Sequence, residues 1–303
     1  MFRKSLVICS TVALAVSVAA AADVPQAASK LSAAEIVDKN VAARGGLQAW
    51  RAVRTMSLEG KMGAGGNQRA TLQVPTPGPT SASGRKSPAR TTLGARPAEE
   101  VQLPFLMEVA RPRKMRFELQ FNGQTAIQVY DGANGWKLRP FLGRSVVEPF
   151  TADETKTASM QADLDGPLVD YAAKGTKIEL AGMEKVEDRN TYKIKLSLKD
   201  GQAIHVWVDA LTFLEAKIEG QPRRLDGTEH PVEVFFRDFR PVSGLMIPYT
   251  LETKVLPVAK TATGLRDTPV PPEKVSIEKV QVNPKFDDAL FSKPQIGVSS
   301  NAK

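Results

Sequence analysis

Alternation of apolar and polar residues over 113–136 is the feature that most limits what this chain can form. Apolar side chains occupy every second position from Met115 to Phe121, with Arg, Glu and Gln between them. Asn122-Gly123 interrupts the alternation, which then resumes as far as Asp131-Gly132. A period of two is that of a β-strand with one buried and one solvated face, and both dipeptides favour tight hairpins. The stretch therefore predicts antiparallel hairpins whose apolar face must cover something.

The same alternation recurs towards the end of the chain, for example over 192–198 and 204–208, which Asp200-Gly201 separates. We expect about ten or eleven strands, joined mostly by short turns, and therefore an antiparallel meander. The predicted helices lie in two places and do not alternate with strands, which argues against a parallel α/β fold. The pattern alone leaves two architectures open. One is a two-sheet sandwich, and the other is a single strongly curved sheet with helices in its mouth.

Two capping boxes predict where the helices begin. Ser32 and Glu35 precede an apolar stripe that ends at Gly45-Gly46, and a short second helix is expected over 47–53. Thr151-Ala152-Asp153-Glu154 is the second box, and it opens a region that we expect to be loosely helical as far as Gly175.

The first 22 residues have the organisation of a signal peptide. A basic Arg3-Lys4 pair precedes an apolar run and then the small residues Ala20-Ala21-Ala22, so cleavage is expected before Asp23 and the protein is expected in the periplasm. The sole cysteine, Cys9, lies in this segment. The larger residues just before it do not suit a lipid-anchored cysteine, so the mature chain, 23–303, is expected as one cysteine-free domain.

Residues 63–100 interrupt the strand pattern. They are rich in Gly, Pro, Ser, Thr, Ala and Arg and nearly lack large apolar side chains, so they cannot bury enough surface to offset the entropy of ordering. We expect a disordered basic insert between two strands. The alternative is a tether that touches lipid head groups or peptidoglycan, since the net charge is +8.

The residue patterns that mark enzymes and metal sites are missing. His205 and His230 are the two histidines, and we expect both to be solvated, because no HExxH-like spacing accompanies them. Residues 163–170, DLDGPLVD, lack the third acidic ligand of a calcium loop, so a turn is expected there. No nucleophile–base signature is present. We therefore expect no catalysis, no cofactor and no metal, and the dispersed basic residues argue against nucleic acid as a partner.

Several stretches together resemble the LolA-like family of exported outer-membrane lipoprotein-sorting carriers. They are ARGGLQAWRAVRTMSLEGKM, RPRKMRFELQFNGQTAIQVYDGANGWKLRPF, DLDGPLVDYAAKG, FFRDFRPVSGLMIPY and VQVNPKFDDALF, in this order along the chain. The resemblance implies an unclosed β-barrel of about eleven antiparallel strands, with helices over its concave side, and it favours the curved sheet over the sandwich. It does not transfer a residue-level site, because these pieces are signatures of strands and turns.

What the resemblance implies for function is a periplasmic carrier or binding protein for lipoproteins or other acylated ligands, with a part in outer-membrane biogenesis. The apolar strand residues expected to line the cavity are Phe117, Leu119, Phe121, Ile127, Val129, Trp136, Leu138, Val206 and Val208. The residues expected in the lid are Met160, Leu164, Leu168 and Tyr171. For each of these residues, plain core packing is the competing interpretation.

A second function remains open from the sequence. The same β scaffold could serve as an envelope interaction or lipid-sensing module that docks on a partner protein, with its cavity filled by its own side chains. The expected partners are thus a lipoprotein or lipid ligand, a possible envelope protein, and a transient contact with a membrane surface.

Overall fold

The computed structural model describes residues 31–65, 100–140, 144–225, 227–259 and 270–295. The predicted signal peptide, 1–22, and residues 66–99 of the predicted insert lie outside the described residues. The insert is shorter at both ends than the sequence indicates, because residues 63–65 and Glu100 belong to strands.

Thirteen strands and four helical segments make up the described structure. The strands are β1 (Thr55–Gly65), β2 (Glu100–Ala110), β3 (Lys114–Phe121), β4 (Gln124–Tyr130), β5 (Gly135–Arg139), β6 (Arg144–Pro149), β7 (Lys177–Val186), β8 (Arg189–Ser197), β9 (Ala203–Asp209), β10 (Glu215–Leu225), β11 (Thr228–Val242), β12 (Leu245–Val255) and β13 (Glu273–Val282). The helices are α1 (Ala33–Ala43), α2 (Leu47–Ala52), α3 (Ala152–Gln161) and the 3₁₀ helix η2 (Asp288–Phe291).

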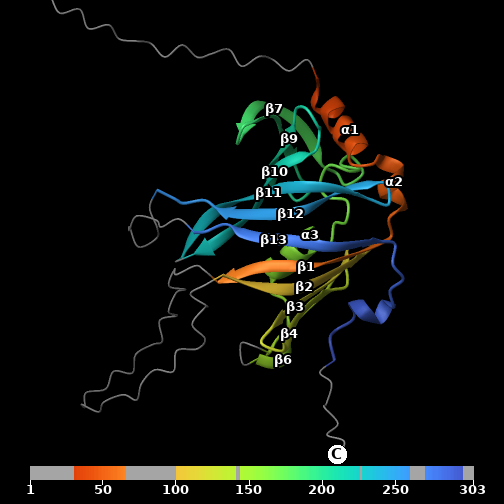
Figure 1. The fold of residues 1–303 in the computed structure, drawn as a ribbon, viewed down its shortest axis with the longest axis vertical. Coiled ribbons are helices and arrows are strands. Elements are labelled where there is room, and N and C mark those ends of the chain that lie inside the picture. Colours follow the sequence, from red (N-terminus) through yellow and green to blue (C-terminus); the bar gives the residue numbers. More distant parts are fainter. Residues whose placement is uncertain (1–30, 66–99, 141–143, 226, 260–269, 296–303) are drawn as a thin grey trace, which may run out of the picture.

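All thirteen strands form one antiparallel sheet in the order β6-β5-β4-β3-β2-β1-β13-β12-β11-β10-β9-β8-β7. Two sequential meanders, β1–β6 and β7–β13, are therefore joined side by side through β1 and β13 (Figure 1). The sheet does not close, because β6 and β7 are its two edges. A single curved sheet is confirmed over the sandwich, with thirteen strands where about eleven were expected.

Both predicted capping boxes are present. The Ser32 hydroxyl accepts from the Glu35 N–H at 3.2 Å while the Glu35 carboxylate accepts from the Ser32 N–H at 2.8 Å, and Thr151 and Glu154 repeat the arrangement at α3. The predicted helical region after α3 is not helical. Residues 162–176 form successive turns, because Gly166 and Asp170 adopt left-handed φ of 73° and 52° and Pro167 follows Gly166.

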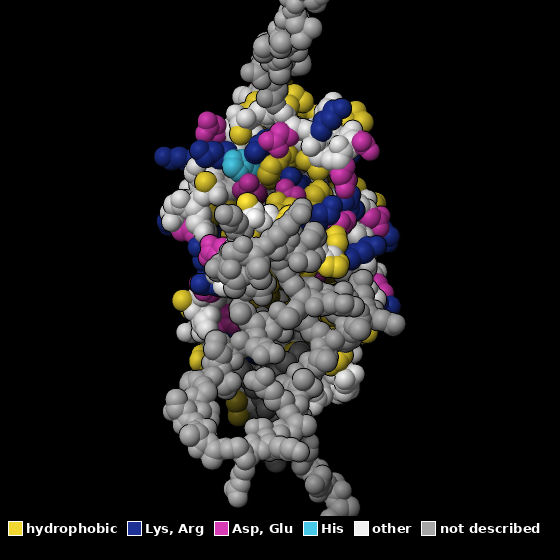
Figure 2. Space-filling model, turned by 90° about the vertical axis from the view of Figure 1, so that its left-hand side faces the viewer, with side chains coloured by type: hydrophobic (Ala, Val, Ile, Leu, Met, Phe, Trp, Pro, Cys, Tyr) yellow, Lys and Arg dark blue, Asp and Glu magenta, His cyan; other side chains and the backbone are white. Residues whose placement is uncertain are grey.

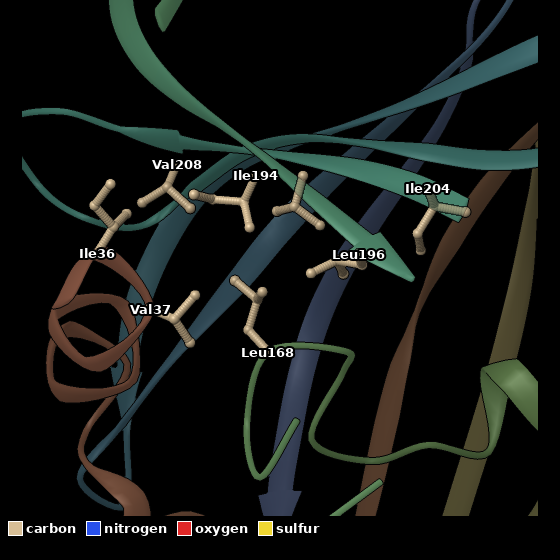
Figure 3. Close-up of a cluster of buried hydrophobic side chains, with 8 residues drawn as sticks. Ile36, Val37, Leu168, Ile194, Leu196, Ile204 and Val208 are labelled. Atoms are coloured by element: carbon tan, nitrogen blue, oxygen red, sulfur yellow. The ribbon is translucent and has the colours of Figure 1, made fainter. Parts of the chain in front are cut away.

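Helices α1, α2 and α3 and the turn segment 162–176 pack on one side of the sheet, which we call the inner face. Ile36 and Val37 of α1 meet Ile194 and Val208 of β8 and β9, with Leu168 beside them (Figure 3). Trp50 of α2 packs against β1 and β12, and Ala158 of α3 packs against β3 and β4. Full burial of a side chain such as Ile36 or Leu168 stabilises the fold by roughly 1.5–3 kcal/mol. These three contacts hold the inner face to its cover.

The opposite, outer face has a cover of its own at the β2–β5 end. Phe291, with Phe286 and Leu290 beside it, packs on Ala110 and Val129. Lys114 forms an ion pair with Asp288 at 3.0 Å and lies over the Phe291 ring. The segment that contains η2 is thus a strap on the outside of the sheet.

No helix in the described part of the chain is both long and apolar enough to cross a membrane.

Two adjacent glycines between α1 and α2 provide a test of how the helices are seated. Both have positive φ, 111° at Gly45 and 90° at Gly46, but only at Gly45 would a Cβ lie 2.2 Å from the Gly244 carbonyl oxygen. We expect Gly46→Ala to lower the free energy of unfolding by about 1–2 kcal/mol through backbone strain. Gly45→Ala should cost about 1–3 kcal/mol more, because the β11–β12 turn must move. Equal losses in urea unfolding would contradict this packing.

Candidate functional site

Between its helical covers, the inner face carries apolar side chains that are only partly buried. Cross-strand partners share a face, so the pairs Met107–Phe117 and Phe105–Leu119 continue the surface on which Met115 contacts α3. The rings of Phe105 and Phe117 stack with their centroids 5.9 Å apart. Phe117, Leu119 and Met107 are all half-buried. The inner face over β2 and β3 is therefore an apolar surface with incomplete cover.

Five of the nine predicted lining residues lie on the inner face, in two different settings. Phe117, Leu119 and Phe121 of β3 are half-buried on the incompletely covered surface. Val206 and Val208 of β9 are fully buried beneath α1 and Leu168, where they form packed core.

The other four predicted lining residues lie on the outer face. Val129 pairs with Trp136 and Ile127 with Leu138, and Val129 packs under the C-terminal strap. The prediction was wrong about their side of the sheet, because the two-residue turn Asn122-Gly123 pairs Phe121 with Gln124. Residues 121 and 124 then share a face, so Thr125, Ile127 and Val129 of β4 point the other way.

The four predicted lid residues all lie over the inner face, but to different depths. Leu168 is fully buried against α1 and the sheet, and Leu164 and Tyr171 are partly buried at the edges of the two neighbouring clusters. Met160, at the end of α3, is 37% exposed and lies beside the Gln221 side chain, with the amide nitrogen 3.2 Å from the sulfur. Of these four residues, Met160 alone borders the larger open space on this face.

That space is a pocket of about 680 Å³ between the α3 side and strands β8–β10. Its apolar floor comes from Leu198, Ile204 and Ile218, and its roof from Met160 and Pro167. Gly220 also lines it, and a Cβ there would come within 2.8 Å of a Val232 methyl. The volume is within the range of about 300–1,000 Å³ that is typical of small-molecule sites.

A second, smaller pocket of about 300 Å³ lies between α1, α2 and residues 168–173. Val37, Val41 and Leu47 line one side of it and Tyr171 the other. On the face shown in Figure 2, apolar side chains gather in the upper part of the molecule, bordered by charged ones.

Basic residues from several elements hold the turn segment 162–176 in place. Asp165 is buried and pairs with Arg111, whose Nε also donates to the Val53 carbonyl at 2.7 Å. Arg44 donates to the Asp165 carbonyl oxygen at 2.8 Å and pairs with Glu215 at 3.1 Å. The segment is thus tied to α1 and β2 by its most buried acid.

Two further ion pairs stabilise the segment, one within it and one that joins it to α2. Lys174 donates to both carboxylate oxygens of Asp163 at 2.8 Å and to the Gly166 carbonyl at 2.6 Å. Arg51 of α2 grips Asp170 with two hydrogen bonds of 2.9 and 2.6 Å. The sequence analysis missed this role for all three acids of DLDGPLVD. The sequence feature that could have indicated this role is the presence of three carboxylates within eight residues that lack the spacing of a calcium site.

Two acids of the cover titrate below their ordinary range. The paired hydrogen bonds from Arg51 lower the pKa of Asp170 from 3.8. Burial acts to raise the pKa of Glu154, but hydrogen bonds from the Lys137 ammonium and the Thr151 N–H outweigh it, and the pKa lies below 4.5. Lys137 reaches α3 from β5, so this pair ties the helix to the inner face.

The two histidines take no part in either pocket's floor. His205 lies 3.0 Å from the Glu219 carboxylate. His230 was expected in a solvated turn, but it is fully buried, with Nδ1 3.2 Å from the Leu256 carbonyl oxygen, because β11 begins at Thr228 and includes it. Among the described residues, no three His, Cys, Asp or Glu side chains are grouped so that they could hold a metal ion.

No family model and no curated protein matches the sequence. Solved structures do match over most of the chain. A LolA superfamily protein from Nitrosomonas europaea aligns with 87% of this chain and 98% of its own, at a TM-score of 0.50 and 13% identity. The fold is LolA-like. At this identity the likeness concerns the fold alone.

Two other solved structures match with TM-scores just below 0.5. A domain described as an outer membrane lipoprotein-sorting protein, from Vibrio parahaemolyticus, covers 86% of this chain and 95% of its own, at a TM-score of 0.48 and 10% identity. A DUF1329 family protein from Desulfovibrio piger covers 86% and 97%, at 0.48 and 13% identity. The LolA-like assignment rests on the first match together with the sheet topology.

Acid should loosen the turn segment at Asp170. Because folding lowers the pKa of this carboxyl from 3.8, its ion pair with Arg51 stabilises the fold above that pH and the contribution is lost as pH falls through the folded value. We expect amide exchange at residues 174–176, whose N–H groups donate to the carbonyls of residues 170–172, to speed up, after correction for intrinsic rates, as the pH falls below about 4. In Asp170→Asn it should be fast throughout. An unchanged pH response in the variant would exclude Asp170 as the group responsible.

Proposed function

We propose that the protein is a periplasmic carrier or binding protein for acylated or other lipidic ligands, which it holds on the inner face of its open sheet. The observation that supports this most directly is the pocket of about 680 Å³ with Leu198, Ile204 and Ile218 as its floor. A pocket floored by side chains that can only make van der Waals contacts suits a hydrocarbon chain and offers little to a polar metabolite.

The size of the pocket and its apolar floor set the scale of binding. Taking one methylene out of water contributes about 0.8 kcal/mol, so a chain of about twelve carbons would gain about 10 kcal/mol if fully buried. A carrier must also release its ligand. The half-buried surface around Phe117 and Leu119 gives the chain a route along the sheet that leaves it partly in contact with water, which lowers that gain.

The cover supplies the second means of release. Residues 162–176 are attached through side-chain ion pairs, and the Arg51–Asp170 pair is on the surface, where such a pair contributes roughly 0.2–1 kcal/mol. Displacing such a segment costs part of the free energy that a chain gains on entry. Net affinity then falls to a level from which transfer is feasible. The proposal assigns no catalytic step and needs no cofactor.

A charge placed in the pocket floor tests the proposal. Ile218→Asp should weaken binding of a fluorescent fatty acid to delipidated protein by at least tenfold, because the carboxylate would be desolvated by the chain. Leu211→Asp is the matched control, since Leu211 is 88% exposed and outside the pocket, and it should bind as the wild type does.

The outcomes separate the two functions considered from the sequence. Saturable binding that the floor variant loses supports a carrier or binding protein. Wild-type protein that binds no probe and carries no lipid in native mass spectrometry would instead favour a docking module. Circular dichroism of both variants confirms that the sheet is intact.

A further inference from the structure

The larger pocket has a charged rim above its apolar floor. Four cationic residues and three acidic residues contribute to its lining. The cations are Arg113, Lys156, Lys174 and Lys199, and the acids are Asp163, Asp200 and Glu219. A purely hydrocarbon ligand would not contact such a rim. Which of these charges are already paired within the protein therefore indicates which of them are left to bind a ligand.

Each of the three acids already has a partner. Asp163 is held by Lys174 at 2.8 Å, and Asp200 lies 3.7 Å from Lys156. The Glu219 carboxylate accepts from the main-chain N–H of His205 at 2.8 Å and lies 3.0 Å from its ring Nδ1. Asp163 and Asp200 are therefore ion-paired within the protein, and Glu219 is hydrogen-bonded to His205 on the face of β10 opposite Ile218.

Arg113 and Lys199 are the cations that remain. Within the described part of the chain neither forms an ion pair, and the one polar contact of the Arg113 guanidinium is a long hydrogen bond of 3.4 Å to the Ser159 hydroxyl. Both side chains are exposed. Arg113 approaches α3 at Ser159, and Lys199 is next to Asp200, which approaches α3 at Lys156. Two unmatched positive charges thus lie by the second half of α3, at the rim of an apolar pocket.

This arrangement deepens the proposed function, on which it rests. We propose that the ligand is an anionic amphiphile, with a carboxylate or phosphate head group between Arg113 and Lys199 and its chain along Ile204 and Ile218. A guanidinium offers paired N–H donors that match a carboxylate or phosphate, and an ammonium adds a flexible point charge. The apolar floor begins directly below this rim, so one elongated molecule satisfies both.

The test compares a fluorescent fatty acid with its methyl ester at pH 8, which differ in charge and share the same chain. Wild-type protein should bind the acid about tenfold more tightly than the ester, and 0.5 M NaCl should reduce the difference, because exposed charges are screened. Arg113→Asn with Lys199→Gln should abolish the preference and leave ester binding unchanged. Asparagine suits the position because φ of Arg113 is 54°.

The matched control is Lys185→Gln, which removes an exposed lysine of β7 outside the pocket and should keep the preference. Equal affinity of the wild type for acid and ester, or a preference that survives in the double variant, would overturn the head-group assignment while leaving the proposed function standing. If the protein binds neither probe, the proposed function itself is contradicted. Displacement of the acid by millimolar inorganic phosphate would show that the rim binds the free anion without a chain, and would also overturn the amphiphile.

Discussion

Burial of the inner face is the constraint on which the rest of this structure depends. A sheet of thirteen strands that does not close has no second sheet to cover it, so the apolar side chains of its inner face need shelter from other elements. Helices α1, α2 and α3 and the turns after α3 shelter parts of this face through Ile36, Trp50 and Ala158. They leave part of β3 uncovered, where Phe117 and Leu119 stay half-buried. Incomplete cover is thus a result of the architecture itself.

The cover is held by two kinds of interaction that differ in how they come apart. Leu168 is inserted into the core beside α1, and its contacts are lost only when the segment lifts as a whole. The ion pairs of Asp165 and Asp170 join the segment to Arg111 and Arg51 of other elements, whereas the pair of Asp163 with Lys174 lies within the segment. Such pairs are weakened by salt. Apolar insertion therefore fixes where the segment sits, and the ion pairs adjust how firmly it stays there.

Local signals in the sequence predicted their own structures well. Both capping boxes and the Asn122-Gly123 turn are confirmed. The single curved sheet is also confirmed, but the strand pattern left it open against a sandwich and only the family resemblance favoured it. The error at Ile127 and Trp136 was avoidable, since a two-residue turn reverses which positions face inward and the sequence contains that turn. The grip of Arg51 and Arg111 on the segment was not predictable, because these partners lie 119 and 54 residues from their acids and no local pattern joins them.

The free edges at β6 and β7 carry a mechanical consequence. In a closed barrel the strand number and stagger dictate one diameter. In this open sheet no closed ring of hydrogen bonds fixes the diameter. Small changes of twist, shared among the twelve strand pairs, can therefore increase or decrease the curvature of the sheet without breaking the hydrogen bonds between strands. For the proposed function, such a sheet can adjust its curvature to ligands of different width.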